Sequence, residues 1–427
     1  MKRLTGTNQE ISELLYQEQL QLSQQNIDVE AKVREIVEDV KNRGDQALHE
    51  YSVTFDNISL DAFEVSQDLI DQAFEEIDQD VLAALKNAKA NIESYHKKQI
   101  ETGFEDQPSE GVIRGQIIRP IERVGVYVPG GTAAYPSSVL MNVIPAKIVG
   151  VKEIIMITPP QEKFVPAILV AAKLSGVDKI YQVGGAQGIA ALAYGTETIP
   201  RVDKITGPGN IFVATAKKQV YGLVGIDMIA GPSEIGVIAD ASANPVYVAA
   251  DLLSQAEHDK LARAILVTNS SKLADQVEVE IEKQLQTLPR QEIARASIEN
   301  NGRIIISENV QGMFDLMNQV APEHLEIAME DAYSYLDKVE NAGSIFLGHY
   351  TSEPIGDYYA GANHVLPTTS TSRFSSALGV HDFVKRIQYT QYSKLAVNKA
   401  EHDITTLAYA EGLQAHARAI EVRNDKS

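Results

Sequence analysis

The sequence predicts an α/β protein with two domains, each built around a parallel-rich β-sheet. Its 427 residues are too many for one ordinary core, and 44% of them are hydrophobic, enough to fill two or three domains. Short β-branched runs alternate with alanine-rich helical segments, and this alternation occurs once before Gly231 and again after it. Strands that alternate with helices of this length form parallel sheets covered on both faces.

Residues 1–100 have a helical pattern and no catalytic signal. Apolar residues are spaced for one helix face between acidic and amide positions, and Gly44, Gly103 and Pro108 interrupt the region. That face consists of Leu69, Ile70, Ala73, Phe74, Ile77, Val81, Leu82 and Leu85. We therefore expect a helical layer in this part of the chain.

The first α/β region begins at Val124. Its strands are expected at residues 124–128, 153–158, 179–183 and 204–206. Its helices are expected at residues 136–150, 165–175, 186–195 and 211–221.

The second α/β region follows Gly231. Its strands are expected at residues 234–239, 264–268, 303–307 and 344–347. Past His381 no further strand rhythm is evident, and residues 395–423 have the pattern of a helical tail that could reach a partner subunit.

Composition disfavours several classes of function. The formal net charge of -20 and the lack of clustered Lys and Arg argue against nucleic acid and anionic membranes as partners. No apolar run approaches the roughly 20 residues that span a bilayer. Polar residues at positions 8–10 stand where a signal peptide would need its apolar stretch. We expect a cytoplasmic protein.

The chain has no cysteine, which excludes disulfides and also a covalent thiohemiacetal on a thiol nucleophile. An aldehyde-oxidising enzyme made from this chain must therefore use water activated by a base.

Four of the nine histidines lie in short polar motifs. Nitrogen and oxygen ligands without thiolates are typical of a catalytic zinc site rather than of a closed structural one.

Gln255 and His258 fall at the end of a helical pattern over residues 246–256. A separation of three residues places both side chains on one helix face, about 5–6 Å apart at Cβ, which suits two ligands of one metal. A histidine near a helix C-terminus also has a simpler explanation, because its charge compensates the helix dipole.

Glu323 and His324 follow Pro322, which favours an extended backbone at Ala321 and disfavours a helix interior. An adjacent carboxyl group and imidazole at a bend provide two proton-transfer groups. The alternative is a helix N-terminus, where Pro and Glu are common and the histidine is incidental.

Two further motifs contain polar candidates. In the glycine-framed loop at residues 356–364, Asp357 is a candidate anionic metal ligand and His364 a candidate substrate contact, although an Asp that begins a turn is often only a turn residue. Glu411 and His416 are five residues apart and diverge by roughly 140° on one helix. They reach one site only if that site wraps around the helix or the helix end is irregular, and the alternative is a charged exposed helix.

Glycine-containing turns follow three expected strands, at residues 128–132, 183–188 and 206–210. Strand ends of an open α/β sheet gather ligands, and helix N-termini there accept phosphate. None of the three matches the G-x-G-x-x-G fingerprint, so each also fits an ordinary tight turn.

Ser233 lies where the two regions join and can face a cleft between them. No G-x-S-x-G elbow surrounds it, and a hinge turn is the alternative.

Taken together and in this order, the motifs resemble histidinol dehydrogenase over nearly the whole chain. The resemblance is carried by residues 124–132, 207–210, 231–234, 254–258, 321–326, 363–368 and 411–416. That family oxidises L-histidinol to L-histidine in two NAD-dependent steps through an aldehyde that stays bound, as the last reaction of histidine biosynthesis. The resemblance implies the same substrate and cofactor for this chain.

The resemblance also implies roles for individual residues. It assigns acid–base work to Glu323 and His324, and one zinc ion per subunit to Gln255, His258, Asp357 and His416. The positions that match substrate contacts are Ser233, Gln255, His258, His324, Asp357, His364, Glu411 and His416. The positions that match nucleotide contacts are Tyr127, Gln187 and Asn210.

A homodimer is implied as well, in which the C-terminal tail crosses to the other subunit and Glu411 and His416 complete the partner's site. The expected domains are a helical N-terminal segment (1–24), a catalytic, metal-binding domain (25–122 and 234–380), an atypical Rossmann-like nucleotide-binding domain (123–233) and a dimerisation tail (381–427).

Two other classes of function remain open. A zinc hydrolase would use the same ligands without NAD, and a non-catalytic binding protein would leave the acid–base residues unexplained.

Overall fold

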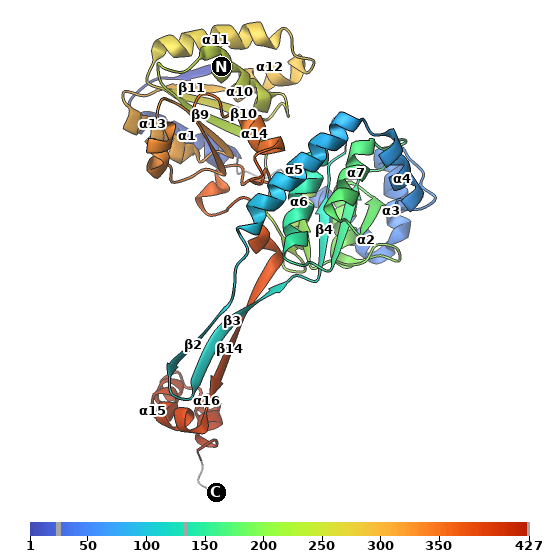
Figure 1. The fold of residues 1–427 in the computed structure, drawn as a ribbon, viewed down its shortest axis with the longest axis vertical. Coiled ribbons are helices and arrows are strands. Elements are labelled where there is room, and N and C mark those ends of the chain that lie inside the picture. The colour runs from blue at the N-terminus through green and yellow to red at the C-terminus, as the bar shows by residue number, and fades with distance from the viewer. Residues whose placement is uncertain (23–26, 131–134, 425–427) are drawn as a thin grey trace.

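The computed structural model describes residues 1–22, 27–130 and 135–424. It has two α/β lobes and a long arm that ends in two helices (Figure 1). Each lobe contains one parallel sheet, of five and of six strands, and the arm is a three-stranded antiparallel sheet. The predicted α/β class with parallel-rich sheets is confirmed.

The five-stranded sheet has the strand order β6-β5-β4-β7-β8, and all its pairs are parallel. Its strands are β4 (Arg123–Tyr127), β5 (Glu153–Thr158), β6 (Lys179–Gln182), β7 (Lys204–Thr206) and β8 (Gly225–Ile226). The helices that follow these strands are α6 (Pro136–Ile148), α7 (Pro166–Ser175), α8 (Gly185–Tyr194) and α9 (Ile211–Val220). The elements predicted between residues 124 and 221 are all present.

The helices near the start of the chain cover this same sheet. They are α2 (Ile27–Arg43), α3 (Asp45–Tyr51), the π-helix η1 (Ser52–Asp56), α4 (Gln67–Glu76) and α5 (Gln79–Lys97). Helix α2 packs on α8 and α9, α4 packs on α7, and α5 packs on α6. The predicted domain joins residues 25–122 to residues 234–380, but these helices pack in the other lobe. An amphipathic pattern shows that a helix face is buried but not against which sheet it packs.

The six-stranded sheet is also parallel, with the order β1-β11-β10-β9-β12-β13. Its strands are β1 (Lys2–Leu4), β9 (Glu234–Ala239), β10 (Arg263–Thr268), β11 (Arg303–Ile306), β12 (His324–Ala328) and β13 (Ser344–Leu347). Its helices are α1 (Asn8–Leu22), α10 (Pro245–Ala256), α11 (Ser271–Leu285), α12 (Gln291–Asn300), α13 (Val310–Val320) and α14 (Glu353–Tyr358), with 3-10 turns η2 (Ala332–Lys338) and η3 (Thr371–Arg373). The 3-10 turn η4 (Val380–Phe383) packs instead on α6 of the other lobe. Strands β1 and β12 were not predicted, and β1 makes residues 2–4 part of this sheet rather than of a helical segment.

The arm corrects the expectation that no strand follows His381. Strand β14 (Val384–Tyr392) pairs antiparallel with β3 (Val112–Pro120), which also pairs with β2 (Phe104–Ser109). Most residues of β2 and β14 are exposed, so neither has the alternation that a half-buried strand shows. The expected helical tail follows as α15 (Lys394–Ala410) and α16 (Gln414–Glu421) at the far end of the arm (Figure 1).

Membrane spanning was tested on the described helices only. None of them is both long enough and apolar enough to cross a bilayer.

Candidate active site

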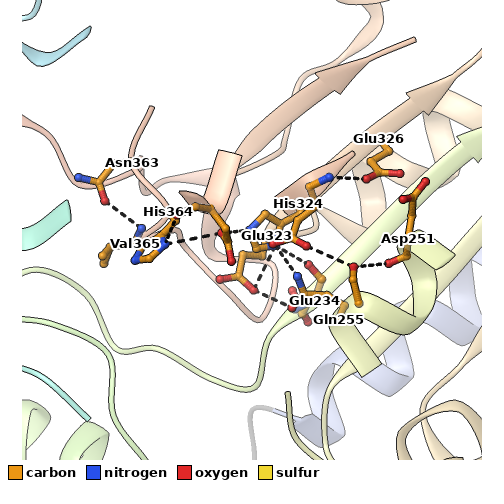
Figure 2. Close-up of polar contacts among 12 residues, drawn as sticks. Glu234, Asp251, Gln255, Glu323, His324, Glu326, Asn363, His364 and Val365 are labelled. Atoms are coloured by element: carbon orange, nitrogen blue, oxygen red, sulfur yellow. Dashed lines mark hydrogen bonds and ion pairs between the residues drawn. The ribbon is translucent and has the colours of Figure 1, made fainter. Parts of the chain in front are cut away.

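A cluster of buried ionisable side chains surrounds His324, the first residue of β12 (Figure 2). His324 lies beside the start of β9 in the parallel ladder and has only 4% of its surface exposed. The cluster therefore lies at the amino ends of β9 and β12, whereas ligands of open α/β sheets usually bind at the carboxyl ends.

Three carboxylates approach the imidazole of His324. Its Nδ1 lies 3.6 Å from Glu323 Oε2, and its Nε2 lies 3.7 Å from Asp357 Oδ1 and 3.8 Å from Glu353 Oε1. Burial alone would lower the pKa of His324, but the negative charges of Glu323, Glu353 and Asp357 outweigh it and raise the pKa to about 10. An ordinary histidine pKa near 6.5 is therefore not what this environment produces.

Glu323 is buried, and its carboxylate Oε2 accepts a hydrogen bond of 2.8 Å from the backbone N–H of Glu234. Burial raises the pKa of Glu323 to about 7. The residue before Pro322 is not extended as predicted: Ala321 is the left-handed C-cap of α13, with φ 50° and ψ 60°. Strain of this kind is tolerated where the surroundings enforce it, often at functional sites.

Asp357 and His364, predicted from one loop, are neighbours in the cluster. His364 Nδ1 lies 3.1 Å from the carbonyl oxygen and 3.7 Å from Oδ1 of Asp357. Burial works against ionisation of Asp357, but the neighbouring imidazoles of His324 and His364 keep its pKa below the ordinary value. His364 Nε2 lies 3.3 Å from Ser138 Oγ on α6, so this histidine connects the two lobes.

Gln255 and His258 reach the same cluster from the end of α10. Gln255 Nε2 lies 3.4 Å from His324 Nδ1, while its Oε1 is buried without a partner among the described residues. Burial lowers the pKa of the half-buried His258. The charge of Asp357 acts against this shift, and the charge of His324 adds to it. An orphaned amide oxygen, a neutral imidazole and a carboxylate are donors of the kind that zinc accepts.

Glu353 belongs to the cluster but was not predicted. His324, Glu353 and Asp357 each place one ligand atom within 4.8 Å of the others, an arrangement able to hold a cation. Glu353 Oε1 is buried without a hydrogen-bond partner among the described residues. The available sequence signal is its spacing of four residues from Asp357, but an acid beside Pro354 is equally typical of an ordinary first helical turn.

Of the other predicted site residues, Ser233 adjoins the cluster, because it precedes Glu234, whose N–H bonds Glu323, and two lie apart from it. Ser233 is half-buried just before β9, and its carbonyl oxygen accepts a hydrogen bond of 2.9 Å from the N–H of Arg263. Glu411 and His416 are exposed between and within the two helices at the far end of the arm (Figure 1). Within one chain the structure does not bring Glu411 and His416 to His324.

The predicted nucleotide contacts lie at the carboxyl ends of the five-stranded sheet. Tyr127 ends β4, and its hydroxyl oxygen accepts a hydrogen bond of 3.3 Å from the N–H of Gly185, the first residue of α8. Gln187 is buried near the start of α8. Asn210 caps α9, with its side-chain oxygen accepting from the N–H groups of Phe212 and Val213.

Comparison with known proteins identifies relatives over the whole chain. The curated histidinol dehydrogenase of Streptococcus mutans is 81% identical over 427 residues, all of both chains. That of Listeria monocytogenes is 59% identical over 425 residues, 99% of each chain. The crystal structure of histidinol dehydrogenase from Elizabethkingia anophelis matches with a TM-score of 0.90 at 41% identity, over 94% of this chain and 93% of that chain.

A more distant match shows the fold alone. An apo betaine aldehyde dehydrogenase from Staphylococcus aureus has a TM-score of 0.50 at 12% identity, over 90% of this chain and 88% of that chain. The sequence model of the family described as histidinol dehydrogenase, by contrast, matches residues 20–424. With that match and relatives of such identity along its full length, the chain belongs to the histidinol dehydrogenase family.

Proposed function

We propose that this chain is a zinc-dependent histidinol dehydrogenase that oxidises L-histidinol to L-histidine with two molecules of NAD. The observation that carries the proposal is the buried cluster in which His324 lies between Glu323 and Asp357, beside Gln255. An acid, a base and metal-type donors in one buried site are what two successive oxidations of a small alcohol require.

His324 is proposed as the base of both oxidations. It removes the hydroxyl proton of histidinol, and later that of the aldehyde hydrate, while hydride passes to the nicotinamide. The carboxylates around His324 raise its pKa, so part of their charge must be offset before the neutral imidazole can act near neutral pH.

Glu323 is proposed to activate the water that attacks the aldehyde. Its pKa of about 7 keeps a large fraction of the carboxylate ionised at neutral pH while leaving it basic enough to accept a proton. Because the chain has no cysteine, this water replaces the thiol that a covalent route would need.

Gln255, His258 and Asp357 are proposed to hold the zinc, together with His416 of a second copy of this chain. When bound, zinc would hold the imidazole and amino nitrogens of the substrate and offset the negative charge beside His324. Ser233, His364 and Glu411 are proposed as further substrate contacts. Glu411 is the C-cap of α15 and His416 lies in α16, and the position of these two helices at the end of an extended arm supports a homodimer that exchanges the two residues (Figure 1).

Tyr127, Gln187 and Asn210 are proposed to contact NAD. Their grouping at the carboxyl ends of β4, β6 and β7 supports this role, because ligands of open α/β sheets gather there and helix N-termini favour the negative charge of a pyrophosphate. We expect the enzyme to work in the cytoplasm.

The decisive experiment measures NADH formed per L-histidinol consumed by the purified protein, before and after zinc is removed by chelation and returned. Two NADH per substrate, lost on chelation and restored by zinc, supports the whole proposal. One NADH would limit it to the alcohol step. Turnover of an ester or amide without NAD would favour a zinc hydrolase instead.

A further inference from the structure

Two buried carboxyl groups beside the active site have no role in the proposed chemistry. Glu326 is the third residue of β12 and has 3% of its surface exposed, and Asp251 is half-buried on α10. The two side chains are hydrogen-bonded to each other. The charges that act most strongly on Glu326 come from two other acids, Asp251 and Glu353.

Two touching carboxyl groups in a buried place do not both ionise, so the pair holds a proton. Burial and the neighbouring Asp251 raise the pKa of Glu326 to about 9, and burial raises the pKa of Asp251. At neutral pH Glu326 is therefore the neutral acid and donates its O–H to Asp251.

The same pair contacts the start of the helix that carries Asp357. Glu326 Oε1 accepts a hydrogen bond of 2.7 Å from the N–H of Glu353, the first residue of α14 (Figure 2). Asp357 follows one turn later on the same helix. The position of the Glu326 carboxyl group therefore helps to fix where α14 begins and where it places Asp357.

On the other side of the pair, Asp251 lies one turn before Gln255 on α10. Ser254 adds a second link between the same elements, because its hydroxyl donates to the carbonyl oxygen of Asp251 at 2.8 Å and lies 3.3 Å from Glu353 Oε2. Strand β12, which carries the pair's Glu326, begins with His324. The carboxyl pair thus ties together α10, β12 and α14.

We propose that Glu326, paired with Asp251, is a positioning residue that holds Gln255 and Asp357 at the spacing needed to bind zinc. This inference rests on the proposed function. Stability alone does not explain the pair, because buried polar groups are costly and apolar side chains of similar volume usually serve a core as well or better. Partners that orient metal ligands typically change metal affinity or activity by about 10–100-fold when removed.

The test compares the zinc affinity of metal-free, full-length variants, measured by competition with a chromogenic chelator. Glu326→Gln keeps an acceptor for the N–H of Glu353 and a neutral donor for Asp251, so we expect an affinity within about threefold of the unmodified protein. Glu326→Leu removes both bonds, and we expect a loss of about tenfold or more, with turnover partly restored by excess zinc.

A matched control separates positioning from a general loss of stability. Ile327→Ala changes a buried residue on the same strand whose side chain points to the opposite face. We expect it to lower the melting temperature but to leave zinc affinity unchanged. If Glu326→Leu does not fold, Asp251→Ala at its half-buried position replaces it, with a smaller loss of affinity expected.

Unchanged zinc affinity in Glu326→Leu, or in Asp251→Ala where that variant replaces it, would overturn the inference. Equal losses in Glu326→Gln and Glu326→Leu would also overturn it, because the amide keeps both hydrogen bonds. These outcomes are distinct from failure of the proposed function, which would appear as no zinc-dependent oxidation of L-histidinol by the unmodified protein.

Discussion

The two parallel sheets use buried charge in opposite ways. Behind the Gly207 turn of the five-stranded sheet, Lys217 and Asp227 form a fully buried ion pair, and each also bonds the backbone of Gly207. Around His324 on the six-stranded sheet, charged groups crowd together while His324 Nε2 and Glu353 Oε1 have no hydrogen-bond partner among the described residues.

This difference teaches which buried charges serve the fold and which serve chemistry. A charge with every partner in place stabilises a turn, whereas buried polar atoms left without partners destabilise the fold and are kept where a ligand is to meet them. Substitutions at the two places should therefore affect different measured quantities.

The largest effect is expected for His324→Ala. If His324 is the base of both oxidations, its loss should lower kcat by about 10³-fold for L-histidinol and for the aldehyde alike. Stopped-flow measurement of NADH from each substrate checks this. Near-normal turnover of either substrate would remove His324 from that step.

Glu323→Gln should separate the two steps. We expect roughly 10²-fold slower oxidation of the aldehyde and little change in alcohol oxidation, because only the aldehyde step needs activated water. Glu323 must be ionised to accept a proton, so the aldehyde step of the unmodified protein should slow as the pH falls through about 7. Equal losses in both half-reactions would contradict the division of roles.

His258→Ala should lower zinc affinity by about tenfold or more. Losing a zinc ligand lowers the affinity more than losing a residue that only orients a ligand. Metal content per subunit after dialysis measures this. His381→Ala, at a more exposed histidine away from the cluster, is the matched control and should retain its zinc. Full zinc retention by His258→Ala would exclude it from the ligand set.

Lys217→Met should have the smallest effect on turnover. Removing one partner of a buried ion pair should lower the free energy of unfolding by about 3–5 kcal/mol, with kcat at saturating NAD nearly unchanged. Chemical denaturation measures the loss. Lys218→Met, in the exposed pair with Glu30, should cost less than about 1 kcal/mol. If Lys217→Met lowered kcat as much as His324→Ala does, the proposed difference between the two sheets would be wrong.

Much of the fold was predictable because buried parallel strands and amphipathic helices leave strong patterns. The strands of the arm were not, because β2 and β14 are exposed and pair through backbone hydrogen bonds that most sequences can form. Strand β12 was missed for the opposite reason. All five of its residues are buried, but the polar residues His324 and Glu326 interrupt the apolar run that predicts a buried strand.

Of the candidate site, the motifs were predictable as residue types but not as a spatial arrangement. Gln255, Asp357 and His364 do meet around His324. Glu353 was missed because its role depends on α14 folding back beside β12, which no local pattern reports. Glu411 and His416 show the limit most clearly, since within one chain they lie at the C-terminus of α15 and in α16 at the end of the arm.

The edge strand β1 has a consequence for the order of folding. Residues Lys2–Leu4 pair with Arg303–Ile305, so β1 leaves the ribosome long before its neighbour in the sheet exists. The five-stranded sheet, drawn from one continuous stretch, has no such delay. The five-stranded sheet can therefore form early in synthesis, while the sheet that carries His324 is complete only after β11 and β13 have been made.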